Sequence, residues 1–282
     1  MPTTTAGIFY RERLPPGEPA GTLLCLHGYP QSSYMWEAVL TAGARAGWRV
    51  VAPDLPGYGD SPLGGQAAVA GTWEAHIEAL GRFHTDLRLG PVVLCVHDWG
   101  GLIGLRWACD NADAVRGLVA GATGFFADGK WHGLAKVMRT PGEGEELAAN
   151  TTREVLGTML ASVSRMDEAA LDACWKAYAT DERRAAQLAL YRSGDFEKLA
   201  PYQGRLGALG VPALLVWGAD DAFAPLAGGR RLRDEIPGAR LVVLEGEGHF
   251  VFDDAPALTA GLVEGFLREL TAQAAAGGSG SG

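Results

Sequence analysis

The sequence predicts an α/β protein in which a mostly parallel, doubly wound sheet carries an inserted set of helices. Short apolar runs recur along the chain, and each ends in a turn that contains glycine. These runs are apolar on both faces, which is typical of parallel strands buried between two helix layers. Helical patterns separate them, and this alternation favours a doubly wound arrangement.

Six runs are expected to form strands of the sheet. They are TLLCLHG at 22–28, WRVVAPDLPG at 48–57, VVLCVHDWGG at 92–101, VRGLVAGATG at 115–124, VPALLVWGADD at 211–221 and RLVVLEGEGH at 240–249. Helical stretches are expected at 72–88, 101–110, 226–236 and 256–272.

One long segment, residues 125–205, interrupts the alternation because it contains no convincing strand. Its helices are expected at 148–164, 167–179, 181–192 and 195–200. Such an insertion is most simply a cap over the carboxyl ends of the strands, where open α/β sheets bind ligands. The predicted organisation is a core at 1–124, a helical cap at 125–205, the rest of the core at 206–273 and a linker-like tail at 274–282.

Composition limits the partners and the compartment. The net charge of −9 argues against nucleic acid or an anionic membrane as the main partner, because both need a basic face. No signal segment and no apolar run of about 20 residues is seen, so a cytoplasmic protein is expected. The cysteines lack CxxC spacing and are expected to be reduced core thiols, without a metal or other cofactor. The sequence does not indicate an oligomeric state.

The run CVHDWGG at 95–101 follows an expected strand and opens an expected helix. Its small or slender residues surround Asp98 as glycines surround the serine in G-x-S-x-G, a turn that exposes the middle side chain at the top of a sheet. Asp98 is therefore a candidate nucleophile. The alternative is that Asp98 only caps the helix that follows, which is a common use of aspartate.

Two further candidates follow other strands. His249 lies in GEGHFVFDDAP, and the carboxylates of Asp220 and Asp221 lie in WGADDAFAP. A carboxylate can hold an imidazole in one tautomer and stabilise its cation, and nucleophile–acid–histidine is a known order for a catalytic triad. The alternative for His249 is a structural histidine.

These motifs together resemble an α/β-hydrolase of the branch that contains haloalkane dehalogenases and epoxide hydrolases. The similarity covers residues 5–272 but is weak in the cap. The segments that carry it are LHGYP at 26–30, APDLPGYGDS at 52–61, VHDWGG at 96–101, WGADD at 217–221 and GHFVFDDAP at 248–256. In the family pattern WG-x-x-D the acid falls on Asp221. Some relatives place it after the preceding core strand, where this chain offers no carboxylate before Asp128.

The resemblance implies a two-step hydrolysis. Asp98 is already ionised and attacks a saturated carbon, which gives an alkyl ester of the enzyme. His249 then activates a water molecule that attacks the ester. The backbone N–H groups of Tyr29 and Trp99 fit the oxyanion hole by position.

The leaving group depends on donors that the motifs leave open. A halide needs hydrogen-bond donors, for which the resemblance suggests the indole of Trp99, whereas an epoxide oxygen needs an acid such as a tyrosine hydroxyl. Tyr191 stands where epoxide hydrolases have their second cap tyrosine, but no tyrosine lies between Trp99 and Tyr178 to serve as the first. Trp131 or His132 could supply a second donor. The alternative is that these two residues pack the hinge of the cap.

Other aromatic and basic positions narrow the substrate. Trp175 and Tyr178, at helical spacing, are expected in the core of the cap. Fluoroacetate dehalogenases have arginines where this chain has Trp99 and Leu102, so a small neutral, apolar organic substrate is expected. The expected enzyme is a hydrolase that converts haloalkanes to alcohol and halide. An epoxide hydrolase that forms diols is the alternative, and a non-catalytic ligand receptor comes third.

Overall fold

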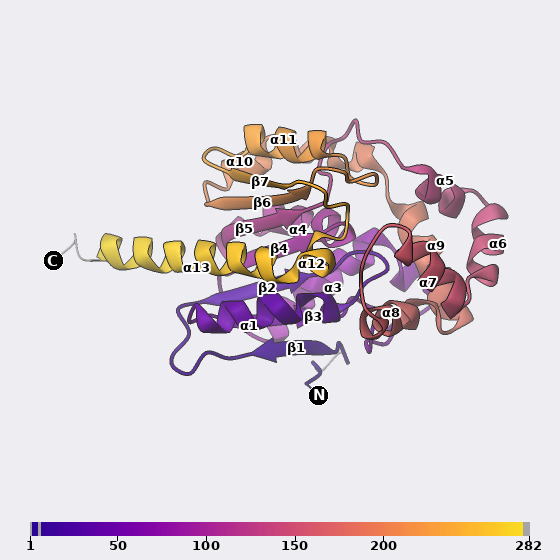
Figure 1. Cartoon of the computed structure of the whole chain (residues 1–282), viewed down its shortest axis with the longest axis horizontal. Coiled ribbons are helices and arrows are strands. Elements are labelled where there is room, and N and C mark those ends of the chain that lie inside the picture. The colour runs from indigo at the N-terminus through magenta and orange to yellow at the C-terminus, as the bar shows by residue number, and fades with distance from the viewer. Residues whose placement is uncertain (1, 5–6, 279–282) are drawn as a thin grey trace.

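The predicted α/β architecture is confirmed by a computed structural model that describes residues 2–4 and 7–278. A seven-stranded sheet has the order β1-β3-β2-β4-β5-β6-β7 (Figure 1). β1 pairs antiparallel with β3, and every other pairing is parallel. The strands are β1 (Tyr10–Arg13), β2 (Thr22–Leu26), β3 (Arg49–Pro53), β4 (Val92–His97), β5 (Val115–Gly121), β6 (Ala213–Gly218) and β7 (Arg240–Leu244).

Helices cover both faces of the sheet, which is why its central strands are apolar on both sides. Helices α1 (Glu37–Arg45) and α13 (Pro256–Gly278) pack together on the face nearest the viewer in Figure 1. Helices α3 (Trp73–Asp86) and α4 (Trp99–Asp110) lie on the other face. Two separate clusters of buried apolar side chains, one on each side of the sheet, form the core. The remaining helices of this part are α2 (Ala67–Ala70), α11 (Leu226–Glu235) and α12 (Val251–Asp254).

The segment between β5 and β6 is helical, and all of its residues are described. It gathers beyond the carboxyl ends of the strands (Figure 1). Its buried residues Leu156, Tyr178 and Leu190 join the same apolar cluster as the sheet, so these helices pack onto the core. Its elements are α5 (Gly133–Arg139), α6 (Glu143–Asn150), α7 (Arg153–Ala161), α8 (Glu168–Trp175), α9 (Asp181–Ser193), α10 (Arg205–Ala208) and the 3₁₀ segments Lys176–Tyr178 and Phe196–Tyr202. A further 3₁₀ segment, Ser33–Trp36, lies in the core directly before α1. The exact division into core and cap stays a prediction.

Some expected boundaries differ from the structure. The single helix expected at 148–164 is wrong, because the chain ends one helix at Asn150 and starts another at Arg153. Thr152 caps the new helix by accepting a hydrogen bond from the Val155 N–H at 3.3 Å. A β-hydroxyl that bonds to the backbone in this way competes with a continuous helix.

Several elements were not expected, among them β1, α1, α2, α5, α10 and α12. β1 has the sequence YRER, whose charges suit an edge strand but give no apolar run. α1 follows a 3₁₀ turn and was also missed. At the other end α13 continues to Gly278, so residues 274–278 are helical where a linker was expected, and residues 279–282 of that expectation lie outside the described residues.

Two expectations from composition concern the cysteines and membrane-spanning helices. All four cysteines (Cys25, Cys95, Cys109 and Cys174) are free thiols with buried side chains, as predicted. Within residues 2–4 and 7–278, no helix combines the length and the apolar character that a membrane span requires.

Candidate active site

Asp98 lies on a tight turn between β4 and α4, with φ of 50° and ψ of −122°. A non-glycine residue with positive φ stores strain of about 1–3 kcal/mol and persists only where its surroundings hold it. Close packing supplies that hold: a Cβ atom added to Gly28 would lie 2.4 Å from the Cβ of Asp98, and one added to Gly100 would lie 2.3 Å from the Leu26 carbonyl oxygen. The glycines next to Asp98 are therefore needed for the turn.

The side chain of Asp98 does not cap the helix that follows it. Asp98 occupies the N-cap position of α4, yet no cap hydrogen bond forms. Its Oδ1 atom instead accepts a hydrogen bond from the backbone N–H of Tyr29 at 2.8 Å. The helix-cap alternative is thus wrong, and the carboxylate faces the loop after β2.

His249 joins the two carboxylates that the sequence singled out. It lies on the loop between β7 and α12, and its side chain is buried. Its Nδ1 donates to Asp221, with distances of 2.9 Å to Oδ2 and 3.1 Å to Oδ1. Its Nε2 lies 3.5 Å from Oδ2 of Asp98. The structure therefore brings Asp98, His249 and Asp221 together.

Asp221 is held more firmly than the carboxylates that competed with it. Its Oδ1 accepts hydrogen bonds from the N–H groups of Phe223 and Ala224, each at 2.8 Å, in the turn after β6. Asp220 is exposed, and Asp128 pairs with Arg231 at the surface at 2.9 Å. Only Asp221, among these three, contacts His249.

The charges of Asp221 and Asp98, one at each ring nitrogen, control the protonation of His249. Burial alone would lower the pKa of His249, but the hydrogen bonds and charges of Asp221 and Asp98 outweigh it and raise the pKa to about 10. Burial would likewise raise the pKa of Asp98, and the hydrogen bond and charge of His249 reverse this and lower it. At neutral pH an imidazolium thus lies between two carboxylates.

His97 supports the loop that carries His249, a role the sequence did not reveal. Its Nε2–H donates to the backbone carbonyl of His249 at 2.9 Å. Burial is the main reason why the pKa of His97 falls to about 4, so the ring is neutral. This contact joins the end of β4 to the loop after β7.

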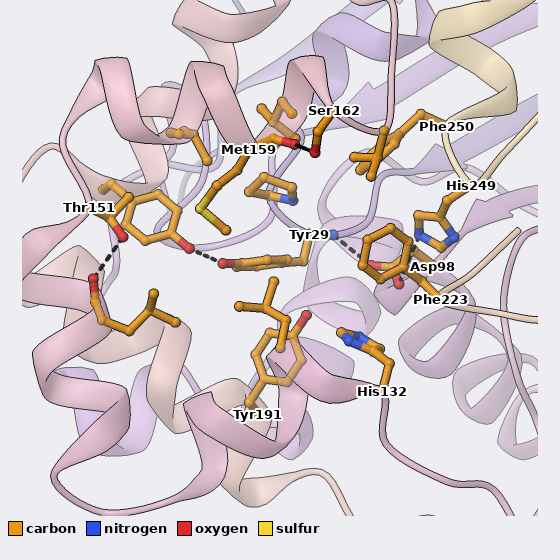
Figure 2. Close-up of a pocket in the computed structure, with 17 residues that line it drawn as sticks. Tyr29, Asp98, His132, Thr151, Met159, Ser162, Tyr191, Phe223, His249 and Phe250 are labelled. Atoms are coloured by element: carbon orange, nitrogen blue, oxygen red, sulfur yellow. Dashed lines mark hydrogen bonds and ion pairs between the residues drawn. The ribbon is translucent and has the colours of Figure 1, made fainter.

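A cavity of about 270 Å³ opens at Asp98 and His249. Figure 2 shows these two residues and Phe223 at one end of it and Thr151 at the other. Most of its wall is apolar: Pro30, Leu134, Leu147, Leu156, Met159, Leu160, Val163, Phe223 and Phe250. Its remaining lining residues are Tyr29, Asp98, His132, Thr151, Ser162, Tyr178, Tyr191 and His249.

Tyr191 lies in this cavity next to Trp99. The two rings meet edge to face, with centroids 5.3 Å apart. Burial raises the pKa of Tyr191 well above its usual value, the charge of Asp98 raises it further, and a hydrogen bond with Trp99 opposes the rise. Because an indole nitrogen can only donate, Trp99 donates to Tyr191, and the hydroxyl of Tyr191 keeps its own proton.

Trp131 belongs to a different part of the site. It stacks on Trp99 at 5.6 Å and packs against Phe196 at 4.4 Å between ring centroids. With Trp99 it lines a second cavity, of about 400 Å³, that also reaches Asp98. That Trp131 donates to the leaving group stays a prediction. Trp131 does not line the cavity that holds Tyr191.

The sequence suggests that His132 either donates to the leaving group or packs the hinge of the cap, and that Tyr178 packs in the core of the cap. Both residues line the cavity. The Nδ1 atom of His132 accepts from the Ala135 N–H at 3.3 Å and so caps α5. Burial lowers the pKa of His132, and the neutral ring therefore carries its proton on Nε2. Tyr178 is buried as expected, and its hydroxyl is hydrogen-bonded to that of Tyr29.

Comparisons of this chain with known proteins agree on one family. A family model described as the alpha/beta hydrolase fold matches residues 21–256. A haloalkane dehalogenase of Mycobacterium marinum is 33% identical over 233 residues, which cover 77% of this chain and 74% of that protein. Haloalkane dehalogenase 2 of Mycobacterium tuberculosis is 32% identical over 256 residues, which cover 86% of this chain and 87% of that protein.

A solved structure shares the fold. The haloalkane dehalogenase DbeA from Bradyrhizobium elkani superposes with a TM-score of 0.83 over 94% of both chains, at 24% identity. The expectation of an enzyme is confirmed by the family model and by the two relatives. The chain belongs to the α/β-hydrolase fold family, in the branch of the haloalkane dehalogenases, and it is a hydrolase.

Proposed function

We propose that this hydrolase cleaves carbon–halogen bonds of small apolar haloalkanes, with Asp98 as nucleophile, His249 as base and Asp221 as the acid that orients it. One observation carries the proposal: Oδ1 of Asp98 binds the Tyr29 N–H while Oδ2 faces Nε2 of His249 at 3.5 Å. The two oxygens of one carboxylate thus have different surroundings, as a nucleophile that becomes an ester requires. The relatives named haloalkane dehalogenases support the same reaction.

In the first step, Oδ2 of Asp98 attacks the carbon that carries the halogen. The new bond joins Oδ2 to that carbon, and the halide leaves with the electrons of the broken bond. Oδ1 becomes the carbonyl oxygen of the ester and stays at the Tyr29 N–H. The lowered pKa of Asp98 keeps the attacking carboxylate ionised at neutral pH.

In the second step, water attacks the Cγ atom of Asp98. The ester carries no charge, so its formation removes one of the two anions that raise the pKa of His249. His249 then loses its Nε2 proton to solvent as its pKa falls, and the neutral ring accepts a proton from the attacking water through Nε2, while Asp221 stabilises the resulting cation. Oδ1 becomes an oxyanion that accepts hydrogen bonds from the N–H groups of Tyr29 and Trp99. As the Cγ–Oδ2 bond breaks, the proton on Nε2 of His249 passes to the leaving oxygen, which departs as the alcohol, and Asp98 is restored with one oxygen from water.

The leaving group is proposed to be stabilised by neutral donors near Asp98. Tyr191 retains its hydroxyl proton after accepting from Trp99, and His132 presents Nε2–H. Among the described residues, no positively charged side chain other than His249 lines the cavity of about 270 Å³. Drug-sized ligands occupy pockets of roughly 300–1,000 Å³, so a smaller, uncharged substrate fits better.

Epoxide opening is the second candidate, and one observation favours it. The buried hydroxyl of Tyr191 lies in the cavity with Asp98, where it could protonate an epoxide oxygen. A tyrosine donor serves both reactions, because a halide needs only a hydrogen bond whereas an alkoxide must receive a proton.

Product analysis tests these assignments. The wild type should release bromide and alcohol from a terminal bromoalkane, and Asp98→Asn should release neither. In a single turnover in isotopically labelled water, the label should enter Asp98 and the alcohol should remain unlabelled, because the alcohol carries Oδ2. Diol from a matched epoxide, without bromide from the bromoalkane, would favour the second candidate. Label in the alcohol would contradict the ester route.

A further inference from the structure

Two tyrosine hydroxyls meet inside the apolar cavity. Tyr29 lies on the loop after β2, and Tyr178 lies on the 3₁₀ segment of the cap that follows α8. Both side chains are buried, and both line the cavity. Their hydroxyl groups are hydrogen-bonded to each other, as one of the dashed lines at Tyr29 in Figure 2 shows. A polar group of this kind in an apolar wall requires an explanation.

The two hydroxyls carry one proton more than their shared hydrogen bond uses. Each phenol carries one proton, and the bond between the two uses one. Among the described residues, neither hydroxyl has a further hydrogen-bond partner. Burial raises the pKa of Tyr178, which keeps its proton in place. One O–H donor therefore remains free in the cavity.

The other hydroxyls on this stretch of the wall are already used. Thr151 donates to the carbonyl of Leu147 at 2.8 Å, and Ser162 donates to the carbonyl of Met159 at 2.6 Å. These bonds stay within their own helices and leave no proton for a ligand. The Tyr29–Tyr178 pair differs from them because its second proton has no acceptor in the part of the chain that the structure describes.

We infer that the Tyr29–Tyr178 pair is a binding subsite for a second oxygen atom of the substrate. The inference rests on the proposed function and deepens it by naming a substrate class: haloalkanes with a hydroxyl, ether or carbonyl oxygen away from the reacting carbon. The backbone N–H of Tyr29 lies at Asp98, whereas its hydroxyl lies at the far end of the side chain. The oxygen of the substrate is thus separated from the reacting carbon by about the length of a tyrosine side chain.

The apolar wall between the two ends fits such a substrate. The ring of Tyr29 meets the ring of Tyr191 edge to face at 5.0 Å, which forms a hydrocarbon surface next to Asp98. A methylene chain can lie along that surface while its two polar ends reach Asp98 and the hydroxyl pair. An alkyl halide without the second oxygen would leave the spare proton unpaired, which costs binding energy.

Binding of product analogues tests the subsite without turnover. Dissociation constants of alkanols and of alkanediols of the same length are measured by NMR titration, over a series of chain lengths. One neutral hydrogen bond is worth about 0.5–1.5 kcal/mol, so at the fitting length the diol should bind about 3- to 10-fold more tightly. The double variant Tyr29→Phe/Tyr178→Phe keeps the backbone and both rings but has no spare proton, and it should bind the two ligands equally. Tyr202→Phe, which removes a surface hydroxyl that donates to Asp110, is the control and should keep the preference.

Turnover supplies the second arm. Wild-type kcat/KM for an ω-bromoalkanol should exceed that for the bromoalkane of the same length, and the double variant should lose this ratio. If the pair only holds the cap to the core, the double variant should lose kcat/KM equally for both substrates, and their ratio should stay unchanged. No preference in the wild type, or the same preference in the double variant, overturns the subsite. Failure of the proposed function would look different: no bromide release from either substrate, whatever the binding constants show.

Discussion

Nε2 of His249 lies 3.5 Å from Oδ2 of Asp98, while the opposite nitrogen of the same ring is held by Asp221 at 2.9 Å. The ring therefore has a fixed orientation, and its Nε2 faces the carboxylate of Asp98. This relationship distinguishes the candidate site from a structural histidine, because a base needs one nitrogen oriented and the other available.

Substitution of Asp221 should impair catalysis, whereas substitution of its neighbour Asp220 should not. Asp221→Asn removes the charge that orients His249 and stabilises its cation, so kcat should fall by about 10²- to 10⁴-fold. Asp220→Asn is the matched control, because this exposed side chain does not contact His249. Initial rates of bromide release measure both. Equal losses in the two variants would contradict the assignment of the acid.

The charge of Asp98 should control the protonation of His249. Asp98→Asn replaces the carboxylate by an uncharged group that resembles the ester, and one of the two anions that raise the pKa of His249 disappears. The pKa should fall below about 10, although Asp221 still raises it, so the neutral fraction of the ring at a given pH should increase. An NMR titration of the histidine rings measures the shift. A pKa that stays near 10 in the variant would show that Asp98 does not govern the base.

The hydroxyl of Tyr191 should separate the two leaving groups. Tyr191→Phe removes a proton donor next to Asp98 but keeps the ring that packs on Trp99. Epoxide opening should fall by at least about 100-fold, because general acid catalysis contributes roughly 10²- to 10⁴-fold. Bromide release should fall by no more than about 10-fold, since losing one neutral hydrogen bond costs about 1 kcal/mol. Parallel assays of diol formation and bromide release measure the two rates. Equal losses of both rates would show that both reactions need the proton.

The turn at Asp98 should not tolerate a side chain at Gly100. The added Cβ of Gly100→Ala would lie 2.3 Å from the Leu26 carbonyl oxygen, which is backbone and cannot move freely. The free energy of unfolding should fall by about 1–3 kcal/mol, as for other overpacked positions, and activity should fall with it. In the exposed part of α13, Gly261→Ala meets nothing within 4 Å and should stabilise by up to about 1 kcal/mol. Urea denaturation compares the two, and a neutral Gly100→Ala would contradict the packing argument.

The fold and the three central residues were predictable from sequence for a shared physical reason. Parallel strands leave continuous apolar runs, and the polar residues that follow them meet at one edge of the sheet. Asp98, Asp221 and His249 each follow such a run, so their order and positions indicated a site before the structure brought them together. The charged edge strand Tyr10–Arg13 was missed because it lacks that apolar signal.

The cavity was less predictable because it depends on how the cap docks. The hydroxyl contact between Tyr29 and Tyr178 joins positions 149 residues apart, and no local periodicity encodes it. Tyr178 showed the spacing of a packing residue, which it is, but that spacing gives no information about the direction of its hydroxyl. The role of His132 depends on a single helix-capping bond that fixes its tautomer.

The most direct test of the central claim is to trap the ester on Asp98. His249→Gln should still permit attack by Asp98 but should not activate water, so incubation with a bromoalkane should add the mass of one alkyl group to the intact protein. Peptide mass analysis should place that group on Asp98, and Asp98→Asn/His249→Gln should show no addition. The account predicts this adduct together with one equivalent of released bromide. Bromide released in repeated turnovers by His249→Gln, or an alkyl group on any other residue, would contradict it.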